Sequence, residues 1–381
     1  MSRRRYNQGG RHVQQDAYHG PRHHERYYDS ERRNGGGSKA FAIISVTALL
    51  ALIVFGAYWF FGDWLTVARA TVPPVREEPG GTVFVSADTH ADADIDRCTG
   101  TFTFLIMGID DSNTDTIMVG TFDTDNKTFD IVNIPRDTLV NVSWNTRKAN
   151  SIYANMRHAH RNDENAEVAA MNATVEKFSD ILGFKVDYWI MVDFRAFESL
   201  VDAIGGVEFH VPVDMYHSGY TLSSGTRLLN GRDALHAVRF RGFQTADIGR
   251  IGTQQDFLMA MSEQLLANRD SIRIRNLANT FLRHAVTDIS LQNLVWFGEQ
   301  FLELESENIT FHTMPANYWD SVGGVSYVSI YVDEWLDMLN TYINPWHTDK
   351  TVDDFSILTR NANGRLFVTD GNWQGDSNWG S

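Results

Sequence analysis

Residues 102–108 (FTFLIMG) decide the fold of this chain, because they form a nearly continuous apolar run. Such a run is typical of a strand whose two faces are both covered by other elements. Two further strands are predicted at 116–122 and 129–134, with the turn-like residues 123–126 between them. These three segments predict the centre of a β-sheet.

Helix patterns follow this sheet. In 163–182, apolar residues recur at spacings of three and four, and Gly183 comes directly after them; this predicts an amphipathic helix that ends there. The remaining predicted elements are strands at 188–192 and 207–213, a glycine-rich hairpin region at 218–231, and helices at 194–204, 254–268 and 291–304. Strands and helices alternate without an internal repeat, so we expect an α/β fold with a mixed central sheet flanked by helices, over residues 101–345. Residues 346–381 are rich in Asn, Gly, Asp and Ser, and a loose C-terminal tail is predicted there.

Composition excludes several classes of protein. The 381 residues are 43% hydrophobic, which is enough for a buried core and excludes wholesale disorder. The net charge is −15, from 48 acidic and 33 basic residues; this does not fit a protein that binds nucleic acid by neutralising phosphates. The single cysteine, Cys98, excludes an intrachain disulfide framework and a cysteine-rich zinc site.

The N-terminal region predicts a membrane anchor. Residues 1–39 hold nine basic and four acidic residues, a net charge of +5, so the rest of the chain carries −20. Residues 40–62 (AFAIISVTALLALIVFGAYWFFG) are 23 residues without a charge; as a helix they extend about 34 Å, enough to cross a hydrocarbon core of about 30 Å. A cleaved signal peptide is the alternative, but its apolar region is shorter and ends in small residues, whereas this one ends in aromatic residues.

The charge pattern predicts the orientation of this anchor. Basic residues precede the span and are scarce just after it, which places residues 1–39, a disordered basic tail, in the cytoplasm. The chain is therefore predicted to be a single-pass protein of the cell membrane whose body, residues 63–381, is extracellular. Residues 63–100 are predicted to be an extracytoplasmic linker. Its acidic run at 91–96 (ADADID) suggests calcium, but no glycine turn or distal Glu follows, so a solvated stalk is favoured.

Carboxylates gather at the ends of the predicted strands. Asp110 and Asp111 follow the first strand directly, Asp115 begins the second, and Arg136 and Asp137 follow the third. The edge where strands end is where α/β sheets place their ligands, and two carboxylates there suit a hard divalent ion such as Mg²⁺. The alternative is that each Asp is only a turn residue.

Arginines form a second cluster. Arg239 and Arg241 are separated by one residue, so on a strand their side chains would point to the same face. Two guanidiniums side by side favour an anion between them, and their planar forks match phosphate oxygens. Arg250 and Gln254 follow shortly, and Arg136 is a candidate to converge with them. A solvated basic edge is the alternative.

Other catalytic templates are not supported. The sequence has no GxSxG, HExxH or GxxxxGK[ST] motif. Cys98 precedes the domain without an evident partner, and His158, His160 and His236 do not form a recognisable zinc set. Spacing alone therefore predicts an outward-facing domain with a metal site and a site for an anion, with phosphate the favoured one.

Seven motifs follow one another between about 102 and 265, the motif core. They read MGID (107–110), TDTIM (114–118), NIPRDT (133–138), KANSIYA (148–154), VDAIGGV (201–207), LNGRDAL (229–235) and the stretch from Arg239 to Gln254. In this order they resemble the motifs of the LytR–CpsA–Psr family of cell-envelope phosphotransferases. An anchor with a short cytoplasmic tail also resembles the layout of that family.

The resemblance implies a transferase and a set of site residues. Such enzymes move a glycopolymer phosphate from a polyprenyl-pyrophosphate carrier to a hydroxyl of peptidoglycan, forming a phosphodiester. By position, Asp110 and Asp115 would hold Mg²⁺ or Mn²⁺, and the apolar body would contain a tunnel for the isoprenoid tail. The residues implied to grip the pyrophosphate are Arg136, Arg239, Arg241 and Arg250, with Lys148, Asp247 and Gln254 lining the site. Asp115 and Asp137 are both candidates to accept the proton of the attacking hydroxyl.

Two positions depart from the family pattern. Asn113 and Thr114 stand where the family usually has Arg-Ser, and Thr253 stands where an arginine is usual. Since each charged hydrogen bond contributes roughly 1.5–3 kcal/mol, pyrophosphate affinity would fall without these two guanidiniums. Retained activity is the favoured interpretation.

Three other functions are compatible with parts of the sequence. The same site would serve a hydrolase that cleaves pyrophosphate lipids with water. The missing arginines admit a non-catalytic protein that binds the lipid carrier. Transcriptional attenuation is disfavoured, because an acidic body outside the membrane does not reach DNA and the 39-residue tail has no helix–turn–helix pattern.

Overall fold

The computed structural model describes residues 77–78, 81–82, 96–110, 113–217, 219–243, 247–376 and 379. The chain divides into two compact units, 1–68 and 69–381, and every described residue belongs to the second. The predicted tail (1–39), the predicted span (40–62) and most of the predicted linker (63–100) lie outside the described residues. Within the part that is described, no helix has the length and apolar character needed to cross a bilayer.

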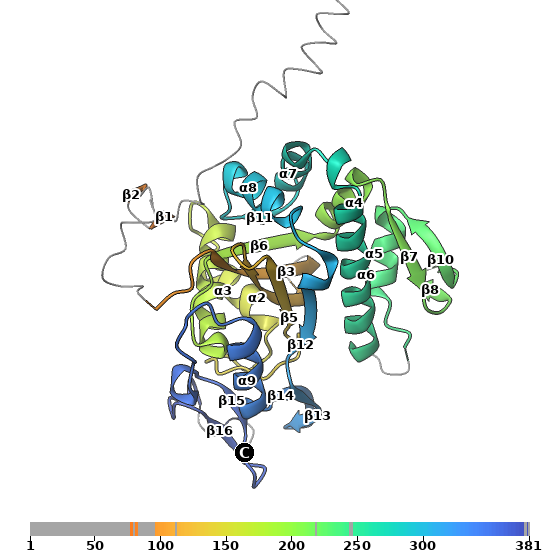
Figure 1. The fold of residues 1–381 in the computed structure, drawn as a ribbon. Helices are drawn as coiled ribbons and strands as arrows, with labels where there is room; N and C mark the ends of the chain where they lie inside the picture. Colours follow the sequence, from red (N-terminus) through yellow and green to blue (C-terminus); the bar gives the residue numbers. More distant parts are fainter. Residues whose placement is uncertain are drawn as a thin grey trace, which may run out of the picture. The chain divides into compact units, whose positions relative to one another are not determined.

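A six-stranded mixed sheet forms the centre of the domain, in the order β11-β6-β3-β4-β5-β12 (Figure 1). The strands are β3 (Thr101–Asp110), β4 (Asn113–Asp123), β5 (Thr128–Asn133), β6 (Tyr188–Asp193), β11 (Val286–Thr287) and β12 (Ile309–Thr313). β3, β4 and β5 are joined antiparallel, whereas β6 pairs with β3 and β12 with β5 in parallel. The predicted mixed sheet is confirmed.

Strand β3 is covered on both faces, as its apolar run predicts. Leu105 and Met107 are fully buried in the core on one face, and Phe104 is buried in the core on the other. Gly120 in β4 has a packing reason: a Cβ there would lie 2.9 Å from Cε2 of Phe129, so only glycine leaves room for that ring. Alternating side chains of one strand therefore enter two separate cores.

Helices α2 (Ser151–Ala159), α3 (Ala166–Leu182) and α9 (Val332–Tyr342) pack on one face of the sheet. The predicted helix at 163–182 is confirmed as α3, which buries Met171, Val175 and Phe178. Gly183 ends it with a φ of 70°, a conformation that glycine adopts without steric cost.

Helices α6 (Asp247–Ala267), α7 (Ile274–Leu282) and α8 (Leu291–Phe301) lie toward the opposite face (Figure 1). Phe297 of α8 packs edge-to-face on Phe102 and Phe104 of β3, with ring centroids 5.1 Å apart in both pairs. Such edge-to-face pairs add stability beyond the area they bury. Helices were predicted at 254–268 and 291–304, and α6 begins earlier than predicted.

A smaller group of helices and strands lies beside the sheet. It consists of α4 (Phe194–Ala203), β7 (Val207–Val211), β8 (Met215–His217), β9 (Tyr220–Leu222), β10 (Gly225–Leu229) and α5 (Gly231–Arg239). One prediction is corrected here: Arg239 and Arg241 do not lie on a strand. Arg239 is the last residue of α5, and Phe240 leaves the helix in an extended conformation. The sequence GRDALHAVR places four residues, Gly231, Ala234, Ala237 and Val238, on one buried helix face.

The predicted loose tail also differs from the structure. Hairpin β13–β14 (Ala316–Val322 and Val325–Ile330) is followed by hairpin β15–β16 (Leu358–Arg360 and Leu366–Val368). Phe355, Ile357 and Leu358 are almost fully buried, and Arg360 Nε donates to both carboxylate oxygens of Asp320 at 2.8 Å. A few apolar residues in an otherwise polar stretch therefore anchor this segment to the rest of the domain.

The other short elements are β1 (Glu77–Glu78), β2 (Gly81–Thr82) and the 3-10 helices η1 (Arg269–Ser271), η2 (Ser306–Asn308) and η3 (Val352–Asp354).

Candidate active site

A β-bulge aims Asp115 at the site. In the β3–β4 pair, Gly108 lies opposite Thr116 and Ile109 lies opposite Thr114, so Asp115 is the extra residue of β4. A bulge reverses the alternation of side chains at that point and re-aims them. Asp115 consequently lines the cavity on the α6–α8 side of the sheet, whereas Ile117, two residues on, is buried in the core on the other side.

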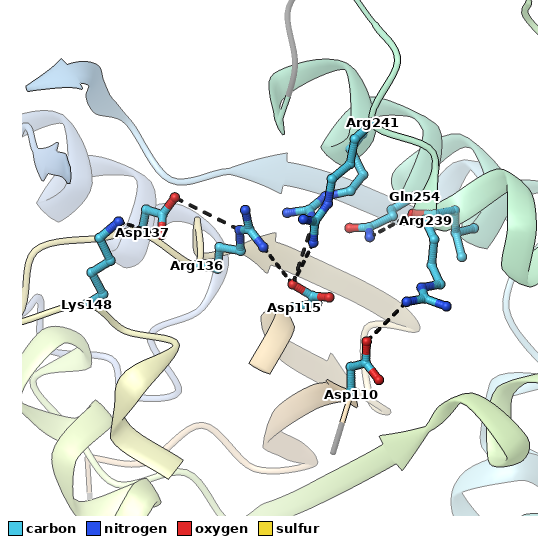
Figure 2. A network of polar contacts seen from close by, with 10 residues as sticks. Asp110, Asp115, Arg136, Asp137, Lys148, Arg239, Arg241 and Gln254 are labelled. Atoms are coloured by element: carbon cyan, nitrogen blue, oxygen red, sulfur yellow. Dashed lines mark hydrogen bonds and ion pairs between the residues drawn. The ribbon is translucent and has the colours of Figure 1, made fainter. Parts of the chain in front are cut away.

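Three guanidiniums converge on one oxygen of Asp115. Its Oδ1 lies 2.7 Å from Nη1 of Arg136, 3.0 Å from Nη2 of Arg241 and 3.8 Å from Nη1 of Arg250. Figure 2 shows Arg136 and Arg241 reaching this carboxylate from different segments. One negative charge facing three positive ones leaves a net positive centre, which suits a multiply charged anion.

Asp110 and Arg239 form the second pair of the site. Nη2 of Arg239 lies 3.1 Å from Oδ2 of Asp110 (Figure 2), and its guanidinium carbon lies 3.9 Å from the ring centroid of Phe194 at the start of α4. The face of this aromatic ring stabilises the guanidinium by a cation–π interaction. Arg239 and Arg241 thus lie close to the two aspartates, Arg239 at the end of α5 and Arg241 two residues after it.

Lys148 and Asp137 extend the network away from Asp115. Nζ of Lys148 lies 3.1 Å from Oδ1 of Asp137, whose other oxygen is 4.0 Å from Nε of Arg136 (Figure 2). The ammonium also lies 5.2 Å from the ring centroid of Tyr327 in β14. Lys148 is therefore held by two contacts at the margin of the arginine cluster.

Gln254 and Asp247 both belong to α6. The side-chain amide of Gln254 donates to the carbonyl of Val238 at 3.1 Å, which ties α6 to the last turn of α5 beside Arg239. Gln254 also lines the cavity, as predicted. Asp247 is the first residue of α6, but its side chain lies outside the described part of the structure.

A large apolar cavity adjoins the charged residues. Its volume is about 990 Å³, and it is lined by apolar side chains of β3, β4, β6, α4 and α6–α8. Examples are Phe104, Met118, Leu265 and Phe301. The charged residues Asp110, Asp115, Arg239, Arg241 and Arg250 line the same cavity. Charged and apolar binding surfaces are therefore continuous.

Tyr318 is a site residue that the sequence did not reveal. It borders a small pocket of about 30 Å³ together with Asp115, Arg136, Asp137 and Arg250. Burial raises the pKa of Tyr318 to about 12, so the phenol stays neutral beside the charged cluster. Tyr318 lies in β13, far along the chain from the motifs, and no local pattern marks it.

Comparison with known proteins assigns the family. A model described as the LytR_cpsA_psr family matches residues 83–343. The chain belongs to the LytR–CpsA–Psr family.

Relatives within this family include proteins of cell-wall assembly. The chain is 30% identical to the cell wall biosynthesis protein LcpA of Corynebacterium glutamicum over 276 residues, which cover 66% of the chain and 53% of LcpA. It is 27% identical to TagV of Bacillus subtilis, a polyisoprenyl-teichoic acid–peptidoglycan teichoic acid transferase, over 209 residues that cover 50% of each protein. The chain thus spans about half the length of these two curated relatives.

Solved structures support the fold. The crystal structure of B. subtilis TagV matches with a TM-score of 0.51 and 23% identity, covering 63% of this chain and 95% of that one. TagT bound to LIIa-WTA matches with a TM-score of 0.51 and 22% identity, covering 66% and 92%. The mixed α/β sheet with flanking helices is therefore the fold of LytR–CpsA–Psr structures.

The two departures from the family pattern have different surroundings. Asn113 is exposed at the start of β4, directly opposite Asp110 in the strand register. Thr253 is only 4% exposed, and its hydroxyl donates to the carbonyl of Gly249 at 3.1 Å within α6. The side chain of Asn113 is thus exposed to solvent beside the site, whereas that of Thr253 is buried.

The two aspartates predicted to hold a metal fit a hard cation only in part. Among the described residues there is no group of three or more His, Cys, Asp or Glu side chains that would hold a metal ion. Asp110 and Asp115 supply carboxylate oxygens from adjacent strands, and each is paired with arginine. Two carboxylates suit an ion such as Mg²⁺ that takes its other ligands from phosphate and water.

Proposed function

We propose that the protein transfers a wall glycopolymer, as its phosphate, from a polyprenyl-pyrophosphate carrier to a hydroxyl of peptidoglycan. One observation carries the proposal: a cluster of arginines lines the same cavity of about 990 Å³ as a long apolar wall. A pyrophosphate headgroup matches the guanidiniums, and a polyprenyl chain matches the apolar wall. The names of LcpA and TagV, proteins of cell-wall biosynthesis and teichoic acid transfer, agree with it.

The reaction we propose is one phosphoryl transfer. The acceptor hydroxyl oxygen bonds to the phosphorus that carries the glycan, and the bond from that phosphorus to the bridging oxygen breaks. Polyprenyl monophosphate leaves, and the proton of the hydroxyl passes to Asp115 or Asp137. Such transfers depend on positioning and charge neutralisation, which Arg136, Arg241 and Arg250 provide around Asp115.

We also propose a divalent cation, Mg²⁺ or Mn²⁺, held by Asp110 and Asp115. When bound, it neutralises charge on the pyrophosphate. For Asp110 and Asp115 to serve as ligands, Arg239 and Arg241 must turn from these carboxylates toward the phosphate oxygens. Both arginine side chains are about half exposed, so they have room to do so.

The proposed cellular setting follows from the sequence. The uncharged stretch 40–62 is proposed to cross the cell membrane once, with residues 1–39 in the cytoplasm and the catalytic domain outside. This arrangement brings the domain to a lipid-linked donor at the membrane and to peptidoglycan.

The test uses the full-length chain in detergent. It is incubated with a synthetic polyprenyl-pyrophosphate saccharide, Mg²⁺ and peptidoglycan fragments, and the products are identified by mass spectrometry. We expect polyprenyl monophosphate and a glycan-linked fragment, both lost in Arg239→Ala and kept in Arg365→Ala, an exposed arginine of the β15–β16 turn. Monophosphate without linked product would indicate a hydrolase. Tight lipid binding without turnover would indicate a carrier-binding protein, which the two missing arginines make a distinct alternative.

A further inference from the structure

Arg147 is a buried cation that the site described above does not use. Its exposure is 1%, and its Nη2 donates to the carbonyl of Gln374 at 2.8 Å. Its guanidinium carbon lies 5.5 Å from the ring centroid of Trp373 and 4.8 Å from that of Trp379. Nε and Nη1 have no hydrogen-bond acceptor within the described part of the chain. Two indole rings and one carbonyl thus contact this guanidinium directly, and the charge of Asp376 also acts on it.

Residues near the C-terminus make further contacts with the loop that contains Arg147. Nδ2 of Asn141 donates to the carbonyl of Asn372 at 2.8 Å, and Oδ1 of Asn141 accepts from the backbone N–H of Gln374 at 2.9 Å. Nε1 of Trp379 donates to the carbonyl of Asn145 at 3.1 Å. Gly375 is packed so closely that a Cβ there would lie 2.9 Å from Cα of Ser143. We call residues 372–376 and Trp379 the C-terminal clamp.

The clamped loop leads directly into the candidate active site. Backbone N–H of Val140 donates to the carbonyl of Arg147 at 3.0 Å, and Leu139 forms an antiparallel bridge with Lys148. The ring of Tyr327, on which Lys148 rests, meets the ring of Trp379 edge-to-face at 5.7 Å. The position of the Lys148 ammonium beside Asp137 therefore depends on two kinds of clamp contact. One kind is with the loop that leads to Lys148, and the other is with the aromatic ring that Lys148 contacts.

We propose that the C-terminal clamp positions Lys148 against Asp137 for the transfer reaction, and this rests on the function proposed above. The clamp lies beyond residue 343, where the match to the family model ends. The clamp residues act through Arg147 and Tyr327 and do not touch the reacting groups. They are positioning residues, and misplacing a catalytic group by about 1 Å costs on the order of 100-fold in rate.

A double-mutant cycle tests the proposal in the full-length chain. Trp379→Ala is expected to lower kcat roughly 10-fold, with a smaller change in KM for the polyprenyl-pyrophosphate donor. Lys148→Ala lowers kcat by itself. In the Lys148→Ala background, Trp379→Ala is expected to have little further effect, because the residue it positions is gone. Trp319→Ala is the matched control, since this tryptophan is 84% exposed.

A second readout does not depend on turnover. Hydrogen exchange of residues 138–149 is expected to be faster in Trp379→Ala and in Trp373→Ala than in the wild type, and unchanged in Trp319→Ala. Independent losses of kcat that multiply in the double variant, or unchanged exchange of 138–149, would overturn the proposal. A wild type without transferase activity would count against the proposed function, and the exchange measurement would still decide whether the clamp holds this loop.

Discussion

Arg250 and Arg241 meet the same oxygen of Asp115 but differ in their exposure to solvent. The side chain of Arg250 is 4% exposed and that of Arg241 is 50% exposed. Solvent and salt screen an exposed charge much more strongly than a buried one. The buried arginine is therefore the larger electrostatic contributor to anion binding.

We predict that Arg250→Ala lowers kcat/KM for the donor about 100-fold, and Arg241→Ala about 10-fold. Raising the NaCl concentration is expected to lower kcat/KM of the Arg250→Ala variant more than that of the Arg241→Ala variant, because the former keeps the exposed Arg241 and the latter keeps the buried Arg250. Steady-state kinetics at two salt concentrations measure both effects. Arg365→Ala is the control for removal of an arginine, and equal losses in the two site variants would contradict the argument.

His312 predicts how stability changes with pH. Its ring stacks on Tyr342 with centroids 3.9 Å apart, and burial lowers the pKa of His312, an effect that the nearby Asp130 partly opposes. The folded state therefore binds this proton less readily than the unfolded state, so stability is lost as pH falls below about 6.5. Burial raises the pKa of Asp130 and acts in the opposite sense, but from a starting value of 3.8.

The measurement is the melting temperature between pH 7.5 and 5.5. We expect the His312→Phe variant to lose less stability over this range than the wild type, because it retains a ring on Tyr342 and has no proton to bind. His284→Asn, a change at an exposed histidine, should follow the wild type. A pH dependence unchanged by His312→Phe would refute the assignment.

At the scale of elements, two glycines predict opposite effects of one substitution. A Cβ on Gly120 would lie 2.9 Å from the ring of Phe129, whereas a Cβ on Gly252 in α6 would meet nothing within 4 Å. Gly120→Ala is expected to cost about 1–3 kcal/mol of unfolding free energy by overpacking, and Gly252→Ala to add about 0.5–1 kcal/mol by helix propensity. Urea unfolding measures both. Phe129→Leu should restore much of the Gly120→Ala loss, and its failure to do so would point to another cause.

Elements were predictable where their signal is local. The apolar run of β3 and the helical spacing of α3 each lie within one segment, so the sequence indicates them directly. The bulge that aims Asp115 is a property of strand pairing, and no single strand shows it. The spacing of Arg239 and Arg241 fits a strand, and a strand was therefore predicted. In the structure, α5 buries one face up to Val238 and continues to Arg239, so Arg239 belongs to a helix.

The sequence predicted the charged residues of the site, but not the residues that pack around them and hold them in place. Asp110, Asp115, Arg136, Arg239, Arg241 and Arg250 gather as the motifs indicate. Tyr318 lies in a segment for which no element was predicted, and the C-terminal clamp lies in the segment that its polar composition predicts to be loose. The contacts of both appear only after the chain has folded. Long-range packing, rather than local pattern, brings them to the site.

At the scale of the whole domain, one cavity joins two kinds of surface. Its apolar wall is built from β3, β4 and β6 and from helices on the α6–α8 side, and its charged residues come from the β3–β4 bulge, the end of α5 and the start of α6. β3, β4 and α6 contribute to both parts, but different side chains form the apolar part and the charged part. The free energy of binding an amphiphilic donor should therefore divide into a tail contribution and a headgroup contribution that are separately alterable.

The cavity predicts how donor affinity depends on tail length. Each added isoprene unit should tighten binding until the volume of about 990 Å³ is filled, and further units should add nothing. Ala278 of α7 lines this cavity and is 5% exposed, so Ala278→Phe should shorten the tail length at which affinity levels off. Arg241→Ala should weaken every donor by the same factor and leave that length unchanged. Isothermal titration with polyprenyl pyrophosphates of increasing length measures both. If Arg241→Ala shifted the length limit, or Ala278→Phe weakened short and long donors equally, the two surfaces would not act as separate parts of one binding site.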